Sequence, residues 1–159
     1  MNAASPYILY IHSILRYFIL LAGVLVVVQS LMGMMGKKKF MPGNRKAALV
    51  LLIFCDLQLL FGLALYSMGG WMSRLSALGG MKDTNTRFYA MEHSVSMIIA
   101  IILIHVGYSI SKKNIDDDRK FKRLFWCSFL ALVIFMAMIP WAGKQVVGRP
   151  NIPTLQTGS

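Results

Sequence analysis

The sequence predicts an all-α integral membrane protein, a four-helix bundle with an N-out/C-out topology. Hydrophobic residues make up 57% of the 159 positions and charged residues only 14%, and the mean hydropathy is +0.60. These values lie far outside the range of soluble globular domains. Four apolar segments are long enough to cross a bilayer, and the basic residues gather in the loops between them. The four spans and the loop charges together determine the predicted topology.

The predicted spans follow from the thickness of the membrane. A helix needs about 20 residues to cross about 30 Å of hydrocarbon. The segments that meet this requirement are approximately residues 7–31, 47–68, 88–110 and 124–142. The loops between them are too short to form a second domain, so we expect a single transmembrane domain over residues 1–159.

The loop charges predict the orientation of the bundle. The first loop, GKKKFMPGNRK, carries five basic residues, and the third, SKKNIDDDRKFKR, carries six. The middle loop has only Arg74, Lys82 and Arg87. The positive-inside rule therefore places the first and third loops in the cytoplasm and both termini outside. On this interpretation the surplus of 17 Lys and Arg over 6 Asp and Glu marks membrane topology, and no nucleic-acid partner is expected.

The remaining segments are expected to be structural. The middle loop has an apolar centre around Trp71 and Leu75, which predicts a short amphipathic helix at the interface. The tail GRPNIPTLQTGS is polar and contains prolines, so we expect it to be mobile. Cys55 and Cys127 fall inside spans without zinc-ligand spacing, which is typical of small buried side chains.

Two histidines occur at matching depths in the predicted bundle. At about 1.5 Å per residue, His12 in HSILRY lies roughly 8 Å below the outer end of the first span. His93 in MEHSVSM lies about as far below the outer end of the third span, which runs in the same direction. Two imidazoles on different helices of one bundle can bind a haem iron from its two faces. His12 and His93 are therefore the predicted ligands of the haem iron.

Two arginines accompany these histidines. Arg16 shares a helix face with His12, four residues away, and Arg87 stands at the outer mouth of the third span. A guanidinium fork suits carboxylates, so both arginines are placed to pair with haem propionates. An alternative is that Arg16 pairs with Glu92 and that Arg87 is an ordinary interfacial charge.

A second polar pair is predicted deeper in the membrane. His105 lies about 120° around the helix from His93, and no second histidine occurs at its depth. Asp56, near the middle of the second span, is the nearest polar group in depth. We expect Asp56 and His105 to face the bundle interior, because exposure to hydrocarbon is costly. They form either a proton relay or a hydrogen-bonded packing pair.

The strings HSILRY, DLQLLFGLALY and RFYAMEHSVSMIIAIILIHVGYS, followed by a helix ending IPW, carry a family resemblance. From about Tyr10 to Trp141 the chain resembles the small four-helix bacterial integral membrane proteins labelled cytochrome B. The resemblance implies a b-type haem protein of the bacterial inner membrane that acts in electron transfer, with His12, Arg16 and His93 at the matching positions. One position departs from the pattern, since the helix 2 motif of the family tends to begin with histidine where this chain has Asp56.

Three functions remain open from the sequence, and whether the protein is an enzyme is not decided by it. The first is a haem b cytochrome that passes electrons between the membrane quinone pool and a redox partner near the outer face. The second is a copper-handling membrane protein, suggested by 12 methionines and by Met97 one turn after His93. The third is a non-catalytic membrane subunit whose polar residues join helices.

Overall fold

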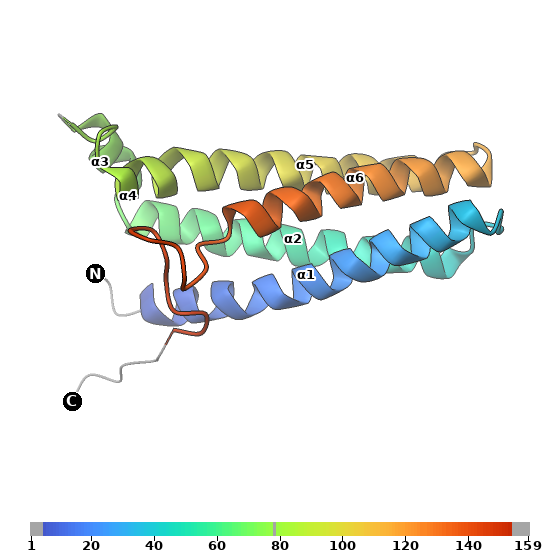
Figure 1. Cartoon of the computed structure of the whole chain (residues 1–159), viewed down its shortest axis with the longest axis horizontal. Helices are drawn as coiled ribbons and strands as arrows, with labels where there is room; N and C mark the ends of the chain where they lie inside the picture. The colour runs from blue at the N-terminus through green and yellow to red at the C-terminus, as the bar shows by residue number, and fades with distance from the viewer. Residues whose placement is uncertain (1–4, 78, 154–159) are drawn as a thin grey trace.

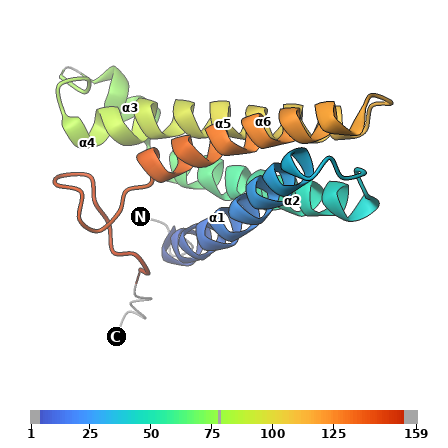
Figure 2. The same cartoon turned by 45° about the vertical axis from the view of Figure 1, so that its right-hand side comes forward.

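Four long helices lie side by side in the computed structural model, which describes residues 5–77 and 79–153 (Figures 1 and 2). The long helices are α1 Ser5–Met35, α2 Pro42–Met68, α5 His93–Ser111 and α6 Asp117–Met138. Three short elements, α3 Trp71–Ser76, α4 Thr84–Arg87 and the π-helix η1 Phe88–Glu92, precede α5. The described residues contain no strand, and α3 confirms the short helix predicted around Trp71.

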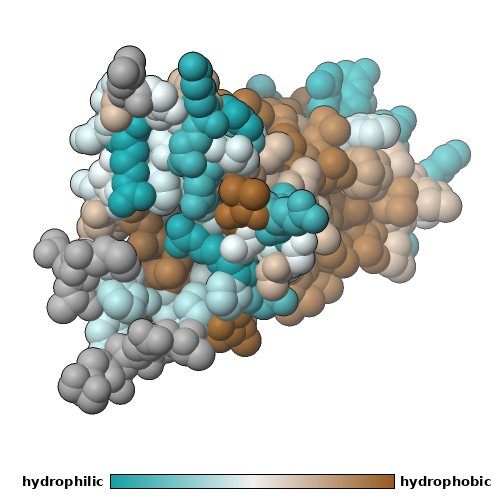
Figure 3. Space-filling model, turned by 60° about the vertical axis from the view of Figure 1, so that its left-hand side comes forward, coloured by the Kyte–Doolittle hydropathy of each residue, from teal (hydrophilic) through white to brown (hydrophobic). Residues whose placement is uncertain are grey.

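The helices are long and apolar enough to make this a multi-pass membrane protein. The candidate spans are Ser5–Met35, Pro42–Met68, Thr84–Ser111 and Asp117–Met138. Figure 3 shows hydrophobic residues over the middle of the molecule and hydrophilic residues gathered toward its two ends. A surface of this kind matches a hydrocarbon layer between two polar interfaces.

The two ends of the bundle differ. We call the end where α1 begins and α6 finishes the terminal end; it also carries α3 and α4 (Figure 1). The opposite end, called the basic end, carries the loops with residues 37–39 and 112–113, all lysines. The positive-inside rule still predicts that the basic end faces the cytoplasm.

The order of helices around the bundle places α1 and α5 diagonally. The principal contacts of α1 are with α2 and α6, and those of α5 are also with α2 and α6. The first and third spans therefore face each other across the bundle axis.

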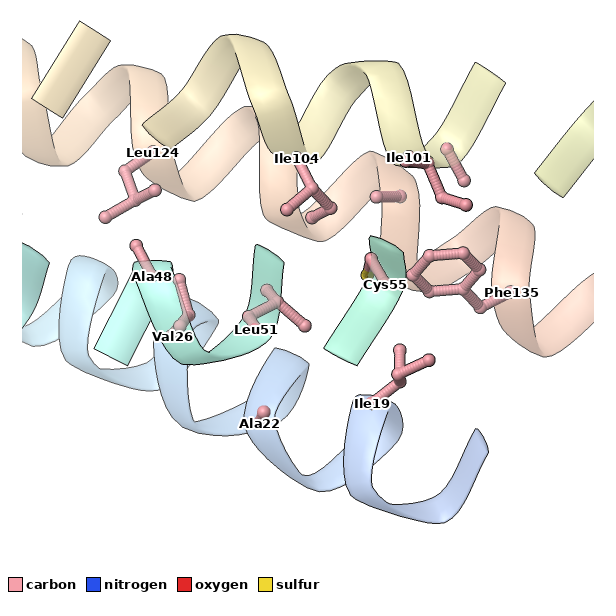
Figure 4. Packing of buried hydrophobic residues seen from close by; sticks show 12 residues of the cluster. Ile19, Ala22, Val26, Ala48, Leu51, Cys55, Ile101, Ile104, Leu124 and Phe135 are labelled. Carbon is pink, nitrogen blue, oxygen red and sulfur yellow. The ribbon is translucent and has the colours of Figure 1, made fainter. Parts of the chain in front are cut away.

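The hydrophobic core runs along this axis (Figure 4). Its buried members are Ile19, Ala22 and Val26 of α1, Ala48, Leu51 and Cys55 of α2, Ala100, Ile101 and Ile104 of α5, and Leu124, Ala131 and Phe135 of α6. Small residues allow close helix approach in membranes. At the basic end, for example, the ring of Phe121 packs directly over Gly33, where a Cβ atom would overlap it. Cys55 is buried as predicted, whereas Cys127 is only partly covered.

The helix α6 begins earlier and ends earlier than predicted. It starts at Asp117, and the negative charges of Asp117 and Asp118 in its first turn interact favourably with the positive end of the helix dipole. It ends at Met138, because Ile139 precedes Pro140 and adopts an extended backbone with ψ of 131°. The IPW string therefore lies outside the helix, and the predicted end of the span at 142 is wrong.

Residues 139–153, which we call the return segment, fold back over the terminal end (Figures 1 and 2). The backbone N–H of Arg149 donates to the carbonyl of Pro140 at 3.1 Å. The Tyr89 hydroxyl donates to the Val147 carbonyl at 2.7 Å, and Arg16 donates to the Asn151 carbonyl. Residues 148–153 of the tail predicted to be mobile thus make contacts at the terminal end, and residues 154–159 lie outside the described part of the chain.

Candidate functional site

His12 projects from α1 toward α2 near the terminal end. A Cβ atom at Gly62 would lie 3.3 Å from His12 Cε1, so the glycine leaves just enough room for the imidazole. Gln58 Nε2 donates to the backbone carbonyl of His12 at 3.0 Å and fixes the two helices at this level. The His12 Nδ1 atom and the Gln58 Oε1 atom are buried, and neither has a hydrogen-bond partner within the described residues. Unpaired polar atoms in the interior are costly and need an explanation.

His93 is held in one tautomer by the end of α6. Its Nδ1 lies 3.0 Å from the carbonyl oxygen of Met138. A carbonyl can only accept a hydrogen bond, so Nδ1 carries the proton and Nε2 keeps its lone pair. Ligand histidines commonly use one ring nitrogen in this way and bind the metal through the other.

A π-helical turn positions His93 among aromatic rings. In η1 the N–H of His93 bonds to the carbonyl of Phe88, five residues earlier, and Ser94 Oγ donates to the freed Tyr89 carbonyl at 2.7 Å. The wider turn places the Phe88 ring 5.8 Å and the Tyr89 ring 6.2 Å from that of His93. Such turns occur frequently at functional sites.

His12 lies on α1 and His93 on α5, both near the terminal end of helices that are diagonal in the bundle. Within residues 5–77 and 79–153, no three His, Cys, Asp or Glu side chains gather into a metal site. His12 and His93 are the two histidines near the terminal end, and each would supply one imidazole to a haem iron if a haem were bound. Met97, one turn below His93, packs against the hydrophobic core.

Arg16 is buried beside this pair, with 8% of its surface exposed. Its Nη2 donates to the Tyr17 hydroxyl at 3.1 Å and to the Asn151 carbonyl, and its guanidinium lies 5.6 Å from the centre of the Trp141 ring. Its Nε is buried and has no partner among the described residues. The Arg16 guanidinium thus lies under the return segment at the terminal end, and its Nε–H is available to a further acceptor.

Arg149 is a site residue that the sequence did not indicate. Its Nε donates to the Tyr89 hydroxyl at 2.8 Å, and its guanidinium lies 4.3 Å from the Tyr89 ring centre. The Tyr89 ring that it contacts lies 6.2 Å from the His93 ring. Tyr89 and Gln58, which complete the cluster, were also not predicted. Arg16 could be predicted from its spacing of four residues from His12. Arg149 could not, because it is more than 50 residues away from the helix residues that it contacts.

Arg87 is engaged elsewhere. Its Nε bonds to Glu92 Oε1 at 2.8 Å, and both side chains are about two-fifths exposed. The alternative pairing of Arg16 with Glu92 does not form. Arg87 thus has a carboxylate partner of its own at the mouth of the bundle.

Asp56 and His105 do form the predicted pair, but on the outside of the bundle. His105 Nε2 lies 2.8 Å from Asp56 Oδ1, while 48% and 43% of the two side chains are exposed. The prediction that both face the interior is therefore wrong. The pair bridges α2 and α5 on their lipid side, since mutual hydrogen bonding lowers the cost of placing either group there. The bond spares each helix an isolated polar group.

The energetic coupling of this pair can be measured. We expect Asp56→Leu and His105→Leu each to lower the melting temperature in detergent, because each leaves one polar group unpaired in hydrocarbon. The double variant should be more stable than the sum of the single effects predicts, with a coupling of about 0.6 kcal/mol and at most about 2 kcal/mol. Strictly additive losses would contradict the pairing.

The fold and the site define a class: a multi-pass α-helical membrane protein in which histidines of two diagonal helices and two arginines gather at one end of the bundle. No protein-family model, curated protein or solved structure matches this chain.

Proposed function

We propose that the chain binds one b-type haem between His12 and His93 and acts as an electron-transfer cytochrome of the bacterial inner membrane. The observation that carries the proposal is the pair of histidines near the terminal end. One has a buried ring nitrogen without a partner, and the other has its Nε2 left free by the bond to Met138. The buried His12 Nδ1 lacks a hydrogen-bond partner among the described residues and the lone pair of His93 Nε2 is available, so we assign both nitrogens to the iron.

The residues around the histidines fit this group. The aromatic rings of Phe88 and Tyr89 beside His93 supply apolar surface against which a haem would pack. Arg16, with its unpaired Nε, and Arg149 are placed to hold two propionates at the terminal end. We assign the second propionate to Arg149 in place of Arg87, because Arg87 is already paired with Glu92.

The protein's part in the reaction is to orient and shield the cofactor. The haem supplies reversible one-electron chemistry. The Met138 carbonyl accepts a hydrogen bond from Nδ1 of His93 and so would leave Nε2 to hold a haem iron, while the return segment would cover the terminal end of the site. In this proposal electrons pass between the membrane quinone pool and a redox partner near the terminal end, which would face outward.

An absorption spectrum of the detergent-solubilised protein tests the proposal. We expect a Soret band in the oxidised protein and sharpened low-spin bands after dithionite reduction. A full-length protein that takes up no haem when expressed with added haem would overturn the proposal. It would favour a non-catalytic membrane subunit.

The proposed orientation has its own test. Lys82, at the terminal end, and Lys39, at the basic end, are both exposed. In intact cells we expect Lys82→Cys to react with a membrane-impermeant thiol reagent and Lys39→Cys to react only after the cells are permeabilised. Labelling of Lys39→Cys in intact cells would reverse the topology.

A further inference from the structure

A cavity at the basic end lies between the start of α2, the end of α5 and the first turns of α6. Its volume is about 140 Å³. Four cationic side chains line it: Arg45 of α2, Lys112 and Lys113 of the loop after α5, and Lys120 of α6. Phe40, Met41 and Pro42 form the apolar part of its wall. The cavity therefore combines strong positive charge with an apolar wall at the level of the membrane interface.

The carboxylates of the adjacent helix start are used mostly by other cations. Asp118 bonds to Lys122 at 2.8 Å, and Asp116 lies 3.4 Å from Arg119, both outside the cavity. Only Asp117 faces a cavity cation, Lys120, at 3.5 Å. Asp116 and Asp118 are thus paired outside the cavity, and Asp117 is the carboxylate of this group that lies beside a cavity cation.

The cavity cations are short of anionic partners. Among the described residues, Arg45, Lys112 and Lys113 have no carboxylate within ion-pair distance. The Lys120 side chain is only 16% exposed, and its ammonium lies 5.6 Å from the centre of the Phe40 ring. Converging cations with a partly buried member favour an anion that each can reach from a different side.

We propose that this cavity binds the phosphate of an anionic phospholipid headgroup. A phosphodiester supplies the missing negative charge, and the acyl chains can follow the lipid-exposed apolar surface of α2. Basic pockets between helices on the cytoplasmic side are suited to such headgroups. This inference is independent of haem binding, because the cavity lies at the opposite end of the bundle.

Two matched triple variants test the proposal. Arg45→Gln/Lys112→Gln/Lys113→Gln removes three cavity cations, while Arg119→Gln/Lys122→Gln/Arg123→Gln removes three cations of the same end outside the cavity. Both lower the net charge by three. Native mass spectrometry of the full chain, titrated with phosphatidylglycerol or phosphatidylcholine in neutral detergent, measures lipid binding.

We expect the unchanged protein to bind phosphatidylglycerol at least tenfold more tightly than phosphatidylcholine. The cavity triple should lose this preference, and the control triple should keep it within about twofold. Inorganic phosphate at millimolar concentration should not displace the lipid. If both triple variants lose the preference for phosphatidylglycerol equally, the preference comes from the overall positive charge of this end, and the proposed site is wrong. If inorganic phosphate displaces the lipid completely, the assignment to a lipid headgroup is wrong.

Folding of the variants is checked independently. The melting temperature and helical circular dichroism without added lipid should match the unchanged protein. If the cavity triple is destabilised, the single variant Lys113→Gln is tested in its place, with Lys122→Gln as its control. The same difference in lipid preference, smaller in size, is then required, and its absence would reject the proposal.

Discussion

Replacing either His12 or His93 by alanine is expected to abolish low-spin haem incorporation. Each substitution removes one of the two imidazole nitrogens that we assign to the iron, and the described residues offer no third His, Cys, Asp or Glu to the same centre. The expected readout is loss of the sharp reduced bands in the dithionite-minus-oxidised difference spectrum. A five-coordinate, high-spin spectrum would mean that the remaining histidine alone retains the haem.

His105→Ala is the matched control, because this histidine lies on the same helix as His93 but bonds to Asp56 on the lipid side. Its spectrum should stay essentially unchanged. If haem survives loss of His12 and His93 and is lost with His105, the proposed site lies at the wrong depth. Circular dichroism of each variant separates haem loss from unfolding.

Removing the positive charge of Arg149 or Arg16 is expected to weaken haem retention rather than abolish it. Arg149→Met and Arg16→Met each delete a charge-assisted hydrogen bond to a propionate, worth about 1.5–3 kcal/mol, or roughly a tenfold to hundredfold loss of affinity. Transfer of haem to excess apomyoglobin measures the change as a faster rate. Arg149→Lys should recover part of the loss, because it keeps the charge without the planar fork.

Arg87→Met distinguishes the two assignments of the second propionate. Because Arg87 is held by Glu92 at 2.8 Å, its removal should leave the haem transfer rate within about twofold of the unchanged protein. A loss at Arg87 equal to that at Arg16, with no effect at Arg149, would restore Arg87 as the propionate partner.

Much of the fold could be predicted because lipid constrains sequence strongly. A span must be long and apolar, and this requirement located all four helices. The start of α6 was missed because its first turns, DDRKFKR, are charged, so the apolar signal begins seven residues after the helix does. Its end was misplaced because the apolar residues continue past Pro140, where the backbone is no longer helical.

The candidate site was only partly predictable. Equal depth on parallel helices indicated His12 and His93, because helical rise converts sequence position into height. Arg149 and Tyr89 meet only after the return segment folds back, and no periodicity encodes that contact. Similar depth in the membrane likewise predicted that Asp56 contacts His105. It gave no information on rotation about the helix axes, so the expected interior location of this pair was wrong.

The return segment also sets an order of events during biogenesis. It follows all four spans in the chain, and its contacts with Arg16 and Tyr89 join parts of helices that must already be inserted. The polar Pro140–Asn151 stretch has to reach its own side of the membrane before it can close over the terminal end. The contacts of the return segment are therefore expected to form last, after α6 has been inserted into the membrane.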